Sequence, residues 1–110
     1  MAKYSATSAV HKTLTATTAD SVTLANVSSG AGVSTPSITV VNRTGTHEIY
    51  FTLSTTGTDP AEPTVGGNDA FVVPAAITSV RVPASISVVG HPAVVKLIST
   101  GAESYSVEAL

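Results

Sequence analysis

Apolar and polar residues alternate with a period of two along much of this chain. The pattern is cleanest over residues 48–53, where Ile49, Phe51 and Leu53 face one side and the residues between them face the other. Alternation of this kind predicts strands with one buried face. No window of the sequence carries the i, i+3, i+4 spacing of an amphipathic helix over three turns. The sequence therefore predicts an all-β protein.

Glycine, proline and short polar clusters divide the alternation into short segments. We expect strands at residues 11–17, 21–26, 37–42, 48–53, 69–73, 79–82, 85–89, 93–99 and 104–109. Short strands separated by turn signals are typical of β-sandwiches, jelly rolls and small barrels. The expected fold is a single antiparallel β-sandwich or jelly-roll-like domain of about eight short strands.

Two features of these segments allow a finer prediction. Residues 37–42 and 48–53 flank a turn that contains Gly45, so they are the best candidates for a β-hairpin. Residues 93–99 carry apolar side chains at both even and odd positions, which predicts a central strand with both faces covered. Either the core or a partner is expected to cover the second face.

The first ten residues hold few large apolar side chains. Such a segment cannot fold alone, so we expect residues 1–10 to form a flexible arm, frayed or laid along a neighbour. Residues 11–110 then form the β-sandwich domain. The same ten residues lack the apolar run of a signal peptide, and no later segment has the apolar length of a membrane span. Synthesis in a cytoplasm without export is the expectation.

Composition narrows the functions that such a fold can serve. Only 11% of the residues are charged and the net charge is −2, while Ser and Thr together supply 31 residues. The surface is therefore expected to be neutral and rich in hydroxyl groups. The absence of cysteine excludes disulfides and thiolate metal sites. The five basic residues are scattered along the chain, which argues against nucleic-acid binding.

Titratable side chains are few and far apart in the sequence. None of the three histidines has a histidine or an acid at the spacing of a ligand pair, and His47 is expected in a surface turn. Asp59, Glu62 and Asp69 flank one loop but lack the spacing of a calcium-binding loop. The sequence also lacks phosphate-binding glycine motifs and nucleophile elbows. We therefore predict no enzymatic activity, no cofactor, no metal and no small-molecule substrate.

The remaining candidates for function are residues suited to protein contact. Tyr50 faces outward on the best-defined strand, and tyrosine is enriched at the centres of interfaces. The alternative for Tyr50 is a role as a cross-strand partner on a solvated face. Tyr4 and Val10 lie on the expected arm, which offers a second contact. Tyr4, Val10 and Tyr50 are thus the predicted partner-contact residues.

Three stretches of the sequence form a distinctive set. They are residues 41–45 (Val-Asn-Arg-Thr-Gly) with 49–51 (Ile-Tyr-Phe), residues 64–69 (Thr-Val-Gly-Gly-Asn-Asp) with 72–75 (Val-Val-Pro-Ala), and residues 94–99 (Val-Val-Lys-Leu-Ile-Ser) with 105–107 (Tyr-Ser-Val). Together they resemble small virion proteins of long-tailed bacteriophages, particularly phages of actinobacteria. The sequence departs from the pattern of these proteins over residues 76–92.

This resemblance implies a structural protein of a phage particle. The group consists of capsid decoration proteins and other accessory head or tail components, so we expect a protein of the capsid surface that is made in the host bacterial cytoplasm. The implied partners are the major capsid protein or another virion protein, together with further copies of the chain in a symmetric cluster. A tail or head-to-tail subunit and a carbohydrate-binding or host-adhesion module are the alternatives.

Overall fold

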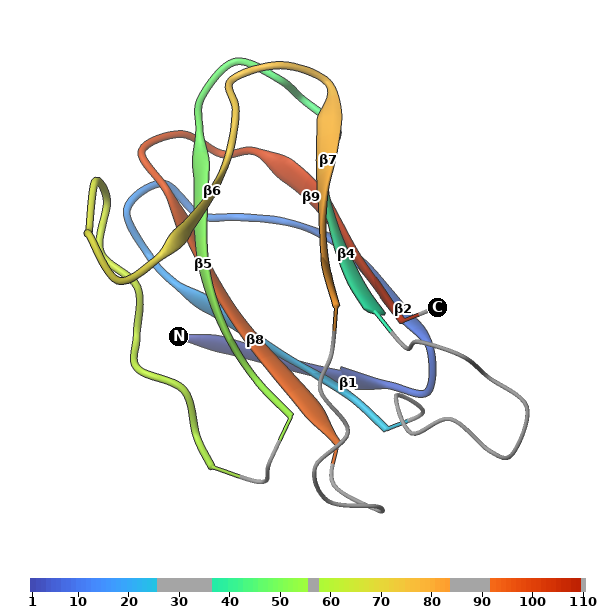
Figure 1. Ribbon diagram of the computed structural model, residues 1–110. Coiled ribbons are helices and arrows are strands. Elements are labelled where there is room, and N and C mark those ends of the chain that lie inside the picture. The colour runs from blue at the N-terminus through green and yellow to red at the C-terminus, as the bar shows by residue number, and fades with distance from the viewer. Residues whose placement is uncertain (26–36, 56–57, 84–91, 110) are drawn as a thin grey trace.

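The computed structural model describes residues 1–25, 37–55, 58–83 and 92–109, and within these ranges the chain forms β-strands and no helix (Figure 1). The strands are β1 (Ala2–Ala6), β2 (Ala9–Thr13), β3 (Asp20–Leu24), β4 (Ser37–Asn42), β5 (Ile49–Ser54), β6 (Phe71–Val73), β7 (Thr78–Pro83), β8 (Ala93–Ser99) and β9 (Ser104–Ala109). The prediction of an all-β fold is confirmed. The strand expected at residues 85–89 lies outside the described residues. In the described part of the chain no helix is long and apolar enough to cross a membrane.

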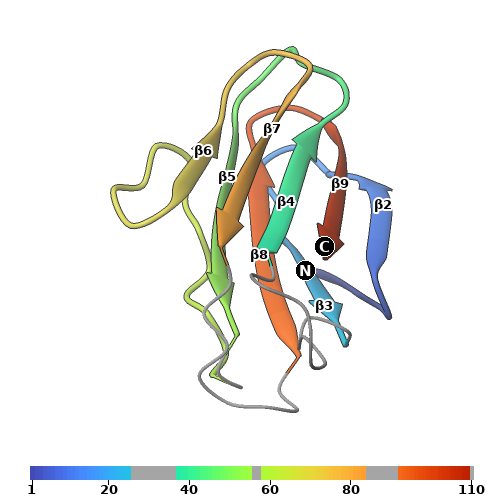
Figure 2. The ribbon, with the colours of Figure 1, turned by 45° about the vertical axis from the view of Figure 1, so that its right-hand side comes forward.

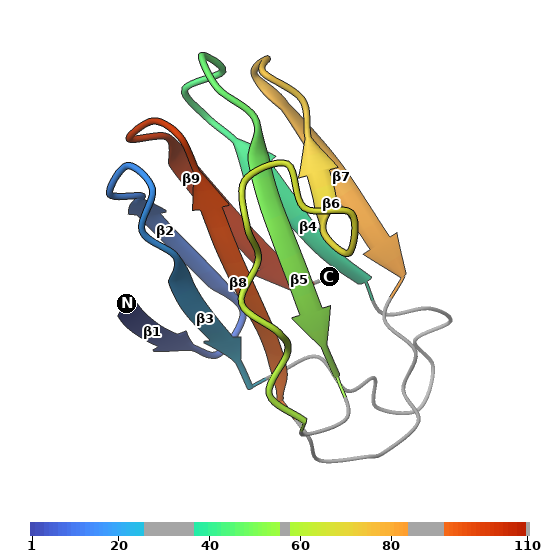
Figure 3. The same ribbon diagram turned by 90° about the vertical axis from the view of Figure 1, so that its left-hand side faces the viewer.

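The strands form two sheets that face each other across a common core. One sheet has five strands in the order β1-β3-β8-β5-β6, and the other has four in the order β2-β9-β4-β7. In Figure 3 the five-stranded sheet lies in front of the four-stranded sheet. The core is made by the inward side chains of both sheets; its buried members are Val10, Leu14, Val22, Leu24, Ile38, Val40, Ile49, Phe51, Val73, Ala93, Val95, Leu97, Tyr105 and Val107.

Strand pairing follows the rule of a jelly roll. Four antiparallel pairs are nested in sequence, β2 with β9, β3 with β8, β4 with β7, and β5 with β6. These pairs describe one long hairpin whose tip lies between β5 and β6. Winding this hairpin into two layers adds the pairs β4 with β9 and β5 with β8. The added strand β1 pairs with β3 in parallel, so the sandwich is antiparallel except at this edge.

The predicted hairpin of residues 37–42 and 48–53 is wrong. Both segments are strands, but β4 lies in the four-stranded sheet and β5 lies in the five-stranded sheet. Each strand finds antiparallel partners inside its own sheet, and residues 43–48 cross from one layer to the other. A turn that reverses the chain between sheets has the same local sequence signal as a hairpin turn. The period-two alternation cannot distinguish the two arrangements, because both bury one face of each strand.

The predicted arm over residues 1–10 is also wrong. Residues 2–6 form β1, which extends the five-stranded sheet, and residues 9–13 form β2, which pairs with β9. The side chain of Val10 is only 6% exposed and belongs to the core. Tyr4 and Ala6 are half-buried against the same core. Few apolar side chains are enough to order residues 1–10, because β1 and β2 also gain backbone hydrogen bonds along a neighbouring strand.

Strand β8 is central, as its sequence predicts, and lies between β3 and β5. Its inner side chains Val95 and Leu97 are fully buried. On its outer face Lys96 is only 8% exposed, and its ammonium lies 2.8 Å from the carboxylate of Asp59. Asp59 belongs to the loop before β6, which crosses the outer face of the five-stranded sheet (Figure 3). The second face of β8 is therefore covered in part by the chain itself.

A buried hydrogen bond joins the two sheets inside the core. The hydroxyl of Tyr105 on β9 donates to the carboxylate of Asp20 on β3 over 2.9 Å, and both residues are buried. Burial raises the pKa of the Asp20 carboxyl, and the bond from Tyr105 lowers it by a smaller amount. Burial also raises the pKa of the Tyr105 phenol, and the bond to Asp20 adds to this effect. The pair satisfies two polar groups that would otherwise be unpaired in the core.

Replacing Val10 tests whether the first residues belong to the core. Val10→Ala removes two buried methyl groups, and we expect the free energy of unfolding to fall by about 1–3 kcal/mol in urea titrations. Thr7→Ala is the matched control, because Thr7 is exposed between β1 and β2 and its replacement should change this free energy by less than about 0.5 kcal/mol. Equal stability of Val10→Ala and wild type would contradict this assignment.

Ionisation of Asp20 should make the free energy of unfolding of the protein fall as the pH rises. Because the folded-state pKa of Asp20 is raised, the contribution of this carboxyl is complete below its unfolded pKa of about 4 and is lost as the pH rises through the folded pKa. Asp20→Asn removes this ionisation and keeps an acceptor for Tyr105. The unfolding free energy of the variant relative to wild type should rise between about pH 3 and pH 7. Asp69→Asn is the control, because Asp69 is exposed. In urea titrations over the same pH range, its unfolding free energy relative to wild type should change less than that of Asp20→Asn.

Candidate functional site

Large exposed apolar side chains gather around the edge strand β6. Val65 precedes the strand, Phe71 and Val72 lie on it, and Ile77 follows it; Ile77 is 77% exposed and Phe71 is 50% exposed. Tyr50 on β5 is directly paired with Val72. Tyr50, Val65 and Val72 lie on the outer face of the five-stranded sheet, and we call these three residues the β6 surface. Phe71 points to the inner face, where its ring stacks on Phe51, and Ile77 lies beside Gly45 in the connection to β7. Apolar side chains that cluster on a surface mark contact sites more often than scattered ones do.

Tyr50 points away from the core because its neighbours on β5, Ile49 and Phe51, point into it. It is half-buried between Ile98 of β8 and Val72 of β6. Its hydroxyl donates to the carboxylate of Glu48 over 2.8 Å. This bond raises the pKa of the Tyr50 phenol above its ordinary value. Tyr50 is thus a neutral aromatic platform with one hydroxyl held in place.

A pocket opens beside this ring. It has a volume of about 310 Å³ and is lined by Thr46, His47, Glu48, Tyr50, Val65, Ala75 and Thr100. Its lining combines an aromatic ring, small apolar groups, hydroxyl groups and one carboxylate. This mixture suits a protruding side chain of a partner protein, since interface pockets combine apolar burial with a few fixed polar groups.

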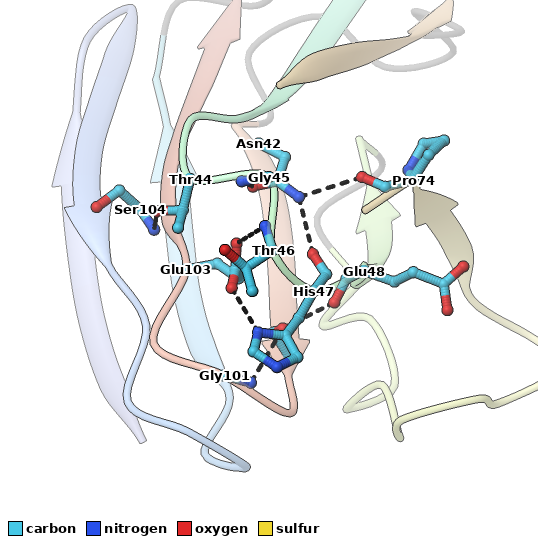
Figure 4. Close-up of polar contacts among 11 residues, drawn as sticks. Asn42, Thr44, Gly45, Thr46, His47, Glu48, Pro74, Gly101, Glu103 and Ser104 are labelled. Carbon is cyan, nitrogen blue, oxygen red and sulfur yellow. Dashed lines mark hydrogen bonds and ion pairs between the residues drawn. The ribbon is translucent and has the colours of Figure 1, made fainter. Parts of the chain in front are cut away.

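The chain connection that supports the pocket is held by Asn42 (Figure 4). Its side-chain amide donates to the backbone carbonyls of His47 at 2.9 Å and Pro74 at 3.2 Å, and its carbonyl oxygen accepts from the N–H of Gly45 at 2.9 Å. Asn42 is fully buried. One side chain therefore ties the connection between β4 and β5 to the connection between β6 and β7, which carry opposite walls of the pocket.

A buried carboxylate fixes the other side of the same connection. Glu103, just before β9, accepts a hydrogen bond from the Nδ1 of His47 at 2.8 Å and from the N–H of Thr46 at 3.2 Å (Figure 4). His47 lies in an exposed turn, as its sequence position predicts. A Cβ at Gly101 would overlap the imidazole of His47, so the lack of a side chain at Gly101 makes room for the ring. The geometry holds one wall of the pocket in a single conformation.

The three predicted contact residues lie in three different parts of the structure. Tyr50 lies on the β6 surface, as described, whereas Val10 is in the core and cannot contact a partner. Tyr4 lies on β1, at the opposite edge of the five-stranded sheet from β6. Its ring packs against the core, and the ammonium of Lys12 lies 4.9 Å from the ring centroid. Lys12 and the core therefore cover much of the Tyr4 side chain.

Sequence reasoning missed the other members of the β6 surface. Residues 71–73 are all apolar, so their pattern alone does not reveal which of them is exposed. Phe71 stacks on Phe51 with ring centroids 5.4 Å apart, but it lies at the edge of its sheet, where no further strand covers it. Glu103 carried no signal in the sequence.

The acids that flank the long loop have separate environments. Asp59 pairs with Lys96, while Glu62 and Asp69 are exposed. Among the described residues, no group of three histidines, cysteines or acids is arranged to hold a metal ion. The side chains gathered here offer burial, stacking and hydrogen bonding, which are the elements of a non-covalent contact.

Comparisons of the chain with protein-family models, with curated proteins and with solved structures found no match. The interpretation of this surface therefore rests on its own geometry and on the sequence stretches described above.

Replacing Asn42 tests the support of the pocket. Asn42→Asp keeps the acceptor for Gly45 but sets a carboxylate oxygen against the carbonyls of His47 and Pro74, so two attractive contacts become repulsive. We expect the free energy of unfolding in urea to fall by about 2–4 kcal/mol. Asn68→Asp makes the same chemical change at an exposed loop position and should have little effect. Similar losses in both variants would show that Asn42 has no special structural role.

Proposed function

We propose that this chain is a structural protein of a tailed bacteriophage particle, and more specifically a capsid decoration protein that binds the outside of the head. In this proposal the β6 surface contacts the major capsid protein. The observation that carries the proposal is the exposed aromatic and apolar group that Tyr50, Val65 and Val72 form on a chain whose sequence is rich in hydroxyl groups.

The position of the sequence stretches that resemble phage virion proteins adds support. Two of the three stretches contain Tyr50, Val65 and Val72, and the fold brings these residues to one place. Residues that are distant in sequence but meet on one surface are expected to act together. The stretches that contain residues 94–99 and 105–107 form central strands of the two sheets and support the fold instead.

Side-chain burial suits this contact better than backbone pairing does. Strand β6 has only three residues and is followed directly by Pro74, which has no N–H to donate. Short edge strands bounded by proline are poor templates for an added strand. Contact through side chains of the β6 surface gives a modest interface for each copy. Many such contacts around a particle add their binding free energies to the assembled shell.

A tail or head-to-tail subunit would use the same exposed surface against a different neighbour. The two roles differ in the number and place of the copies on the particle. A labelled chain on the head in hundreds of copies supports decoration, whereas a label along the tail or in a single ring supports the alternative.

Charged substitutions on the β6 surface test the proposal. Val65→Lys and Val72→Lys together introduce two cations into the proposed contact, and both positions are exposed, so the fold should persist. We expect occupancy on purified heads that lack the protein to fall at least about tenfold at a fixed protein concentration.

The matched control is Ser5→Lys, an exposed position on β1, at the far edge of the same sheet. Its occupancy should equal that of wild type. Thermal unfolding of all variants verifies that they are folded. Undiminished binding of the double variant would remove the β6 surface from the contact, and failure of the wild-type chain to bind any part of the particle would overturn the proposed function.

A further inference from the structure

The outer face of the four-stranded sheet is not crossed by any described segment (Figure 2). Its side chains are mostly small. Thr39 and Val41 of β4, Ser79 of β7 and Ser106 of β9 occupy its middle. Sheets with short side chains can approach another sheet closely, at the spacing of about 10 Å that is usual for stacked sheets.

Two opposite charges stand on either side of the middle strand of this face. Thr39 is paired with Glu108 of β9 on one side and with Arg81 of β7 on the other. Glu108 and Arg81 are therefore two strands apart, at about 10 Å between their backbones. The Nε of Arg81 donates to the hydroxyl of Ser37 over 2.7 Å, and no ion pair links Arg81 or Glu108 to another charged group within the described ranges.

This order of charges is self-complementary under a twofold rotation. When the twofold axis runs parallel to β4, midway between the two faces, β9 of one copy lies opposite β7 of the other. Glu108 of each copy then lies opposite Arg81 of the other copy, and Thr39 lies opposite Thr39. A symmetric pair of this kind forms two identical ion pairs from one acid and one base per chain.

We propose that the outer face of the four-stranded sheet binds the same face of a second copy of this chain. The order of the charges fits a second copy as the partner, because a twofold axis along β4 pairs Arg81 and Glu108 of both copies at once. The sheets pack face to face in an aligned orientation, with the hydroxyl and methyl groups of the middle rows between them.

The size of the face sets the strength of this dimer. An axis along β4 brings three strands of each copy, β9, β4 and β7, into contact. Three strands about 4.8 Å apart and five residues about 3.4 Å long cover roughly 14 by 17 Å, which is smaller than the footprint of a standard interface. The dimer should therefore be weak in dilute solution and form at high local concentration. The dimer face lies on the opposite sheet from Tyr50 and Val72, so dimer formation does not depend on the proposed function.

Charge reversal provides a direct test. Arg81→Glu and Glu108→Arg each place like charges opposite one another twice, so each variant alone should raise the dissociation constant of the dimer at least about tenfold in sedimentation equilibrium. The double variant Arg81→Glu/Glu108→Arg restores both pairs with their signs exchanged, and it should dimerise within about threefold of wild type. An equal mixture of the two single variants should form mixed dimers for the same reason.

Glu62→Arg is the matched control, since it reverses an exposed acid on the loop before β6 and should leave the dissociation constant unchanged. Thermal unfolding verifies that every variant is folded. A wild-type chain that stays monomeric up to about 1 mM, or single reversals that leave the dimer intact, would overturn the proposal. Failure of the double variant to recover would do the same. If Arg81→Glu lowers head occupancy of a chain that is always monomeric, the face belongs to the coat contact instead.

Discussion

Burial of one face of every strand against the opposite sheet is the constraint on which the rest of this structure depends. With no cysteine and few charges, the chain has no other large source of stability. The inward side chains fill the space between the sheets, and the bond from Tyr105 to Asp20 satisfies two of the polar groups that the core encloses. The position of each outward side chain, including Tyr50, Arg81 and Glu108, follows from its inward neighbours.

The sequence contained most of the strands but only part of their arrangement. Alternation located β4, β5 and β9, and a continuous apolar run located β8, because both patterns are local properties of the chain. The sheet to which each strand belongs is not local, so the turn after β4 was interpreted as a hairpin although it joins two layers. Val10 was placed on an arm for a related reason. Its burial comes from residues near the other end of the chain, and composition alone contains no information about them.

The candidate site also contains residues that local patterns predict and residues that depend on the topology. Tyr50 was predictable because a tyrosine at an outward position on a regular strand is a local signal. Phe71 and Val72 were not, since their exposure depends on β6 being the last strand of its sheet. The interaction of His47 with Glu103 joins residues far apart in sequence and was equally hidden. Local patterns predicted which side of a strand a residue occupies, and topology decided whether that side is covered.

The nested pairing also governs the order in which this protein can form. β9, the last described strand, lies between β2 and β4 in the four-stranded sheet, and the hydrogen bond between His11 and Ser106 joins residues 95 positions apart. A ribosome that has released only β1 to β6 has not yet supplied this central strand. The four-stranded sheet can therefore form only after β9 has been synthesised, and pairing over such sequence distances is slow, on the order of milliseconds to seconds. Until then β2 and β4 have no strand between them.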